Sequence, residues 1–339
     1  MARSKVRLFL LGGTITMADS AAPDSAHSSA TGGVVPTVDA AALCRAVPGL
    51  ADVAEVEART DLMIASGNLT YAHALALATE INAAATAGDV DGFVVVQGTD
   101  TLEEMAFLLD CLLDIAPPVV VTGALRSAAA LSADGPANIL AAVTAAATAD
   151  LGRAGVMVVM NDDIHSACFV TKSHTGSPAA FTSPTMGPIG RVTEGRATLY
   201  AVPRRGAMVN IPSQKRLPRV ALLSASYGDD GFLLNLLAGA GCDGLVIEAF
   251  GAGHVPEAYL ASLEKLVKTG PVILASRTGS GPVFQETYGY PGAEIDLISR
   301  GLIPAGILDG RKAKILLTLL MMNKVAADGI RAAFESWTY

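Results

Sequence analysis

The chain has 339 residues, of which 51% are hydrophobic, 17% charged and 5% aromatic. This composition excludes a disordered or collagen-like chain, and the length predicts two domains or one large one. The net charge of −8, from 24 Lys and Arg against 32 Asp and Glu, and the lack of a basic run argue against a nucleic-acid partner.

The uncharged stretches do not predict a membrane span. Residues 62–79 include glycine, asparagine and histidine, residues 135–149 are rich in alanine, and residues 173–190 contain prolines. None of them is a strongly apolar segment of about 20 residues. The first apolar run is too short for a signal peptide, so we expect a cytoplasmic protein with no membrane partner.

Short apolar runs alternate along the chain with longer stretches rich in alanine and leucine. The expected strands are residues 6–11, 93–96, 119–122, 156–160, 220–224, 245–247 and 272–275. The expected helices are residues 40–46, 72–87, 102–113, 137–149, 232–238, 257–268 and 311–323. Continuous apolar strands alternating with helices are typical of a parallel sheet covered on both faces, so the sequence predicts an α/β fold.

This alternation breaks between residues 173 and 216, where prolines recur. We therefore expect two domains, a larger N-terminal parallel-sheet domain over residues 1–210 and a smaller C-terminal α/β domain over residues 218–339, joined by a linker at 211–217. Residues 19–35 are rich in serine, alanine and glycine, which predicts a mobile surface loop.

Cysteine and histidine spacing does not indicate a metal site. The four cysteines lie far apart with no C-x-x-C pair, which predicts isolated core thiols. The five histidines show no i, i+4 pairing, so no metal is expected.

Two expected strands end in similar threonine turns. Residues 6–11 run into Gly12-Gly13-Thr14, and residues 93–97 run into Gly98-Thr99-Asp100. Ligands of open parallel sheets bind beyond the carboxyl ends of the strands, and glycine lets a backbone approach a ligand closely. Either turn alone is also compatible with a structural role, with Thr14 as a turn residue and Asp100 or Thr101 as a helix cap. The repetition at two strand ends favours a functional site.

The sequence resembles the bacterial asparaginase/glutaminase family from about residue 6 to residue 325. The similarity is carried by two threonine turns, a glycine-alanine turn, an Asp-Gly-Pro helix start and a lysine segment: Gly12-Gly13-Thr14-Ile15, Gln97-Gly98-Thr99-Asp100-Thr101, Gly123-Ala124-Leu125-Arg126, Asp134-Gly135-Pro136 and residues 158–175 with Lys172. Two spaced threonine motifs together with the lysine make the resemblance specific.

The resemblance implies a cofactor-independent hydrolase that converts L-asparagine to L-aspartate and ammonia. Thr14 would attack the side-chain amide, and Thr99, Asp100 and Lys172 would form a second catalytic cluster. A threonine hydroxyl needs a proton acceptor. A buried lysine amine gives up its proton more readily and can serve, with Asp100 holding it in place. Glycine-flanked turns offer N–H donors for the tetrahedral oxyanion.

The resemblance also indicates where the substrate's α-groups bind. Ser66 matches the family serine that contacts the α-carboxylate, although it is also compatible with an ordinary turn serine. Asp100 would accept from the α-ammonium group. Gly67, Gly98 and Ala124 are further expected substrate-binding positions.

Three departures from the family pattern stand out. Gly67 occupies a position where the family usually has Gln or Asp. Residues 16–38 contain no tyrosine, whereas the loop of secreted members carries one that activates the nucleophile; Thr16, Ser28 and Thr31 are candidate replacements.

The third departure lies in the smaller domain, where His254 replaces a common asparagine. His254 is also compatible with a structural histidine. Glu286 and Tyr288 are candidates for the family's glutamate, ahead of Glu294. The resemblance implies a homotetramer, a dimer of dimers, in which these residues complete a neighbouring subunit's site. High apolar content and low charge agree with large interfaces.

Other readings stay open at this point. One is an amidotransferase subunit of the same fold that passes ammonia to a partner enzyme, although such a subunit normally carries an additional N-terminal domain. An amino-acid-binding module without turnover is suggested by Gly67 and by the missing loop tyrosine. A nucleotide-binding domain is disfavoured, because Gly251-Ala252-Gly253 is not followed by the third fingerprint glycine. Asparagine and glutamine differ by one methylene, so the sequence leaves the preference between them open.

Overall fold

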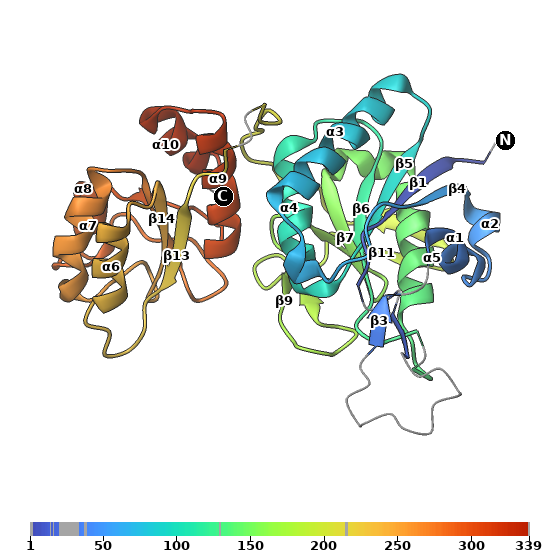
Figure 1. Ribbon diagram of the computed structural model, residues 1–339, viewed down its shortest axis with the longest axis horizontal. Helices are drawn as coiled ribbons and strands as arrows, with labels where there is room; N and C mark the ends of the chain where they lie inside the picture. Colours follow the sequence, from blue (N-terminus) through green and yellow to red (C-terminus); the bar gives the residue numbers. More distant parts are fainter. Residues whose placement is uncertain are drawn as a thin grey trace. The chain divides into compact units, whose positions relative to one another are not determined.

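The computed structural model describes residues 3–13, 15, 17–19, 34–36, 39–128, 130–213 and 216–337, with only the backbone for 17–19 and 34–36. The chain divides into two compact units, Met1–Arg204 and Arg205–Tyr339, which are described separately (Figure 1). This division falls before the linker expected at 211–217. The expected mobile loop lies outside the described residues except at its ends, where β2 (Met17–Asp19) pairs antiparallel with β3 (Val34–Pro36).

The first unit is built on an eight-stranded sheet with the order β12-β11-β8-β7-β6-β5-β1-β4. Five neighbouring strands are parallel: β4 (Glu55–Thr60), β1 (Lys5–Leu10), β5 (Gly92–Val96), β6 (Val119–Thr122) and β7 (Val156–Met160). Three antiparallel strands continue the sheet: β8 (Asp163–Ser166), β11 (Gly190–Thr193) and β12 (Arg196–Leu199). The strands β5, β6 and β7 are buried along their whole length, as continuous apolar runs require.

Helices cover both faces of this sheet. On one face, α1 (Ala40–Arg45), α2 (Leu50–Val53) and α5 (Gly135–Ala146) share a core with the inward side chains of β1, β5, β6 and β7. On the other face lie α3 (Tyr71–Ala87) and α4 (Leu102–Leu112) (Figure 1). Thr70 begins α3 with a capping box, and Gly88 ends it in the left-handed conformation. Almost all of α4 is buried, which makes it a firm support for residues at its amino end.

The second unit contains a parallel sheet with the order β13-β14-β15-β16. The strands are β13 (Val220–Ser224), β14 (Gly244–Ala249), β15 (Val272–Ser276) and β16 (Ile303–Pro304). The helices are α6 (Phe232–Ala240), α7 (Leu260–Val267), α8 (Glu294–Ser299), α9 (Gly310–Met322) and α10 (Ala327–Glu335). Side chains of α6, α7 and α8 form one core with the sheet, and α9 covers the opposite face (Figure 1).

The predicted α/β class is therefore confirmed, and each expected strand and helix has a counterpart within a few residues. The sequence pattern missed β4, because its sequence Glu-Val-Glu-Ala-Arg-Thr alternates and lies at the sheet edge, where one side meets solvent. Of the cysteines expected in the core, Cys111 and Cys168 are buried, whereas Cys44 and Cys242 are only partly buried, which corrects the expectation for these two. Within the described ranges, no helix combines the length and the apolar character needed to cross a bilayer.

Candidate active site

The site lies where the connections of the large sheet change direction. The chain leaves β1 towards β4 on one side and returns as β5 on the other side. Such a switch point opens a crevice at the carboxyl ends of the strands. Leu10 and Val96 are paired at these ends, so the turns that follow them begin side by side.

The two turns touch through their glycines. Gly13 has a φ of +98°, and a Cβ atom placed on it would lie 2.2 Å from the backbone nitrogen of Gly98. A Cβ atom placed on Gly98 would in turn lie 2.8 Å from Ser66 Oγ. The hydroxyl of Thr101 donates to the carbonyl of Ser66 over 3.0 Å. Three segments far apart in the sequence therefore meet, and they carry the predicted residues Gly98 and Ser66.

An amine lies between a hydroxyl and a carboxylate at this edge. Thr99 and Asp100 form the short helical turn η3 (Thr99–Thr101), and Lys172 lies on β9 (Thr171–Lys172). The Lys172 Nζ donates to Thr99 Oγ1 over 2.9 Å and to Asp100 Oδ1 over 2.7 Å. Thr99 is 6% exposed, and the side chains of Lys172 and Asp100 are 15% and 77% exposed. The hydroxyl and the amine are thus largely shielded, while the carboxylate reaches solvent.

The main chain of Lys172 has a partner that sequence analysis missed. Its N–H donates to Glu103 Oε2 over 2.6 Å, across 69 positions of sequence. Glu103 lies in the first turn of α4, where acidic residues are common for reasons of helix polarity alone. No sequence spacing therefore distinguished it from its neighbour Glu104.

The turn after β6 packs beside Thr99. A Cβ on Gly123 would lie 2.5 Å from the Gln97 carbonyl and 3.3 Å from Thr99 Cγ2. The buried Asn138 side chain donates to the Gly123 carbonyl over 2.9 Å and accepts from the Asn161 N–H over 3.0 Å. This amide ties the ends of β6 and β7 together.

Asp134 shapes the continuation of that turn. Its carboxylate accepts from the N–H groups of Leu125 and Arg126 over 3.0 and 2.9 Å. Ala124, an expected substrate-binding position, is buried. Because its side chain is a methyl group, only its backbone can make a polar contact. Gly67, another expected position, is exposed, and a Cβ on it would meet nothing within 4 Å.

Thr14 lies outside the described residues, as do Thr16, Ser28 and Thr31. Its neighbours are placed. Gly13 contacts Gly98. The side chain of Ile15 is buried, and a Cβ atom placed on Gly135 would lie 2.7 Å from it. The approach of Thr14 to Thr99 and Lys172 stays a prediction.

In the second unit, His254 belongs to a hydrogen-bonded cluster. Its Nε2 lies 3.1 Å from Glu294 Oε2, and its Nδ1 lies 3.0 Å from the Tyr290 hydroxyl. The ring of Tyr288 packs edge-on against the imidazole, with centroids 5.0 Å apart. Glu286 is exposed. Of the residues that sequence analysis weighed as the glutamate equivalent, Tyr288 and Glu294 are thus the ones in contact with His254.

The side chain of Glu294 is not exposed to solvent. Burial alone raises the pKa of Glu294, but N–H donors from Tyr288 and Thr287, at 2.6 and 3.0 Å, together with His254 hold that pKa below its ordinary value. With its proton on Nε2, a neutral His254 donates to the Glu294 carboxylate and accepts from the Tyr290 hydroxyl at Nδ1.

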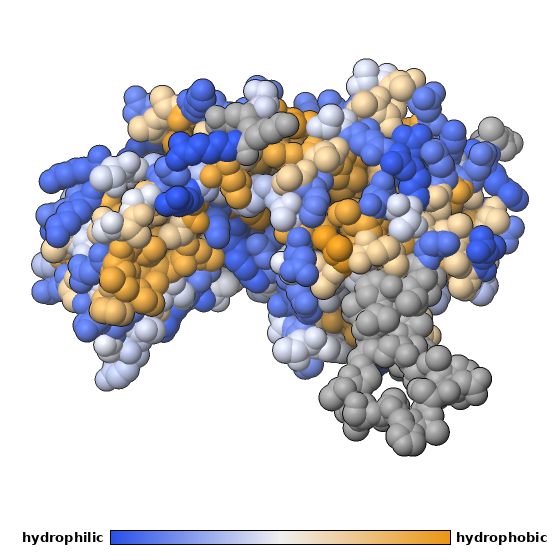
Figure 2. All heavy atoms as spheres, viewed as in Figure 1, coloured by the Kyte–Doolittle hydropathy of each residue, from blue (hydrophilic) through white to orange (hydrophobic). Residues whose placement is uncertain are grey.

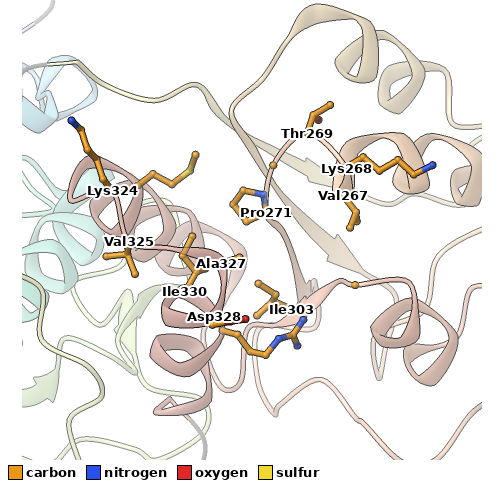
Figure 3. A pocket seen from close by; sticks show the side chains of 14 residues that line it. Val267, Lys268, Thr269, Pro271, Ile303, Lys324, Val325, Ala327, Asp328 and Ile330 are labelled. Carbon is orange, nitrogen blue, oxygen red and sulfur yellow. The ribbon is translucent and has the colours of Figure 1, made fainter.

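A groove of about 540 Å³ lies in the second unit, at the end of its sheet where β15 begins (Figure 3). Its lining includes Pro271, which precedes β15, whereas His254 follows β14 at the opposite end. In Figure 3, the side chains of Lys268 and Lys324 extend away from Pro271 on opposite sides. The groove is therefore separate from the His254 cluster.

Comparisons with known proteins cover almost the whole chain. The family model described as Asparaginase, N-terminal matches residues 5–205, and the model for the Glutaminase/Asparaginase C-terminal domain matches residues 219–334. L-asparaginase 2 of Bacillus subtilis is 31% identical over 98% of this chain and 86% of its own length. A probable L-asparaginase of Deinococcus radiodurans is 36% identical over 87% of this chain and 89% of its own. The crystal structure of a probable cytoplasmic L-asparaginase from Campylobacter jejuni superposes with a TM-score of 0.85 at 29% identity, covering 98% of this chain and 100% of that one.

Proposed function

The chain belongs to the asparaginase/glutaminase family, and from this premise we propose that it is an L-asparaginase, an amide hydrolase that releases ammonia from the side chain of L-asparagine. The observation that carries the proposal is the contact of the Lys172 amine with both Thr99 and Asp100 at the switch point of the sheet. An amine beside a shielded hydroxyl is equipped to move a proton, which amide hydrolysis requires.

In the proposed mechanism, Thr14 Oγ bonds to the amide carbon of asparagine while its proton passes to a basic group. The C–N bond then breaks, and ammonia leaves with a proton from the enzyme. Water adds to the resulting ester, and aspartate is released as Thr14 regains its proton. Lys172 takes part as proton carrier through Thr99, and Asp100 holds the amine.

Backbone N–H groups of the glycine-flanked turns at Gly98 and Ala124 stabilise the oxyanion in this scheme. Ser66 and Asp100 bind the α-carboxylate and the α-ammonium group, with Gly67 contributing only its backbone. No metal or cofactor enters the proposed reaction.

We further propose that the enzyme is a cytoplasmic homotetramer, a dimer of dimers. In this assembly, His254 and Glu286 would serve a neighbouring copy's site. Helix α6 supports self-association, because it carries no charged residue and exposes Phe232, Leu233 and Leu236, where Figure 2 shows an apolar patch. The relative from Campylobacter jejuni is itself described as a probable cytoplasmic L-asparaginase.

A steady-state comparison of L-asparagine, D-asparagine and L-glutamine, read as ammonia released, tests the function. We expect L-asparagine to be hydrolysed and Thr14→Ala to abolish both turnover and the acyl-enzyme seen by mass spectrometry. Thr86→Ala, on the exposed face of α3, is the matched control and should keep full activity. Full ammonia release by Thr14→Ala would disprove the assigned nucleophile.

A second candidate is an amino-acid-binding module without turnover. The open space beside Gly67 favours it, because a side chain that would contact the substrate is missing there. Calorimetric binding of L-aspartate by a chain that releases no ammonia from any of the three amides would select this candidate over the enzyme. Ammonia release only in the presence of an acceptor enzyme would instead indicate an amidotransferase subunit.

A further inference from the structure

Both ends of Lys172 are held by one short segment of chain. Its amine donates to Thr99 and Asp100 over 2.9 and 2.7 Å, and its main-chain N–H donates to Glu103 Oε2 over 2.6 Å. The proposed mechanism uses the first two contacts and leaves the third without a role.

Strand β9, which carries Lys172, is not part of the large sheet. Among the described strands it pairs with β10 (Phe181–Thr182) alone, in a separate two-stranded sheet, with Phe181 opposite Lys172. The ladder of the eight-stranded sheet therefore does not fix the distance from Lys172 to Thr99. Glu103 supplies a direct contact between the main chain of Lys172 and α4, from outside the small sheet.

Glu103 is well placed to act as an anchor. It is 2% exposed and lies in the first turn of α4, whose residues are almost all buried and which packs on β6 and β7. The amino end of a helix favours a carboxylate. A short N–H···O distance to a carboxylate is characteristic of the stronger class of hydrogen bond. The anchor is thus both rigid and directional.

We propose that Glu103 is a positioning residue of the amidohydrolase site. Its carboxylate fixes the main chain of Lys172 and so keeps the amine within hydrogen-bonding distance of Thr99 and Asp100. Glu103 does not touch substrate. This inference rests on the proposed function, because it concerns the turnover of that same site.

The kinetic test compares Glu103→Ala and Glu103→Gln, with Glu104→Gln on the next position as control. We expect Glu103→Ala to lower kcat about 30- to 100-fold with KM changed less than about threefold, since a displacement near 1 Å of a reacting group costs about 10²-fold. In Glu103→Gln the amide oxygen still accepts the Lys172 N–H, so kcat should recover to within about fivefold of the unaltered enzyme. The control should stay within about twofold.

Two kinetic outcomes would overturn the inference. One is a Glu103→Ala enzyme that keeps kcat within about threefold. The other is a Glu103→Gln enzyme as slow as Glu103→Ala, because a hydrogen-bond acceptor at this position would then not be what matters.

A second measurement does not depend on activity. The rate at which acetic anhydride modifies Lys172 in the folded chain, followed by mass spectrometry, reports how firmly the amine is held. We expect this rate to rise at least about fivefold in Glu103→Ala and to stay unchanged in Glu104→Gln; an unchanged rate in Glu103→Ala would overturn the inference. If the unaltered chain releases no ammonia, the proposed function fails while the labelling still tests the anchor. Glu103→Asp, whose carboxylate is too short to reach, serves if the alanine variant does not fold, and it too should label faster.

Discussion

Replacing Lys172 by methionine removes one charged group and keeps the length of the side chain. The amine of Lys172 donates to the shielded Thr99 hydroxyl and to the exposed Asp100 carboxylate. Only the first contact serves the proposed proton transfer. The substitution therefore separates a catalytic role from a contribution to stability.

The two effects differ greatly in size. Asp100 is 77% exposed, so water takes over its hydrogen bonds, and loss of the ion pair costs about 0–1 kcal/mol of folding free energy. Loss of a general acid–base group lowers turnover about 10²- to 10⁴-fold. At about 1.36 kcal/mol per tenfold, this corresponds to about 2.7–5.4 kcal/mol of activation free energy. We expect activity to collapse while the Tm hardly changes.

The assay pairs ammonia release at saturating L-asparagine with thermal denaturation of the same sample. Lys265→Met, at an exposed position of α7, is the control and should leave both measurements unchanged. A Lys172→Met enzyme within about fivefold of the original kcat would refute the assigned role. A loss of activity matched by unfolding would refute the separation of catalysis from stability.

Three further predictions concern stability. Gly98→Ala places a Cβ 2.8 Å from Ser66 Oγ and should cost about 1–3 kcal/mol in denaturant unfolding, while Gly67→Ala, which meets nothing within 4 Å, should cost nothing; equal behaviour would contradict the tight contact of the turns. Burial raises the pKa of Glu294, but N–H donors hold that pKa below its ordinary value. The ionised side chain therefore stabilises the fold at neutral pH, and this stabilisation is lost as the pH falls through the pKa that Glu294 has in the folded chain. The Tm of Glu294→Gln should therefore fall less steeply below about pH 4.5 than that of the unaltered chain, and parallel curves would count against an ionised Glu294. Asp309→Ala removes the side-chain cap of α9 and should lower the unfolding free energy by about 1–2 kcal/mol in urea titrations, with an unchanged midpoint speaking against the cap.

Buried parallel strands are the elements that the sequence predicted best. Runs such as β6 and β7 are apolar at every position because helices cover both faces of the sheet. Strand β4 does not follow this pattern, because its sequence alternates polar and apolar residues and none of them is fully buried. Its Glu57 pairs with Arg7 of β1 over 2.9 Å, a contact between side chains that only the register of the two strands brings together.

The residues of the site likewise fall into those that the sequence predicted and those that it missed. The glycine-threonine turns and the Lys172 segment could be predicted because each motif is local and their combination resembles one family. Asp134 belongs to the Asp-Gly-Pro motif, but the sequence does not show what its carboxylate binds, and Glu103 and Asn138 were not singled out at all. Each of the three side chains acts through a hydrogen bond to a backbone group 8 to 69 positions away, and backbone groups are identical in every sequence.

The sequence alone determines which segments become buried strands, which turns carry threonine hydroxyls and which segment carries the lysine. It also determines the family. Periodicity and motif chemistry are properties of neighbouring residues, so they can be recognised without the tertiary structure. The tertiary structure decided which of these groups meet. Lys172 lies on a small sheet of its own, and its distance to Thr99 depends on the packing of α4 and on the contact with Glu103. Distances across 70 positions of sequence are set by the packed core, which no local pattern encodes.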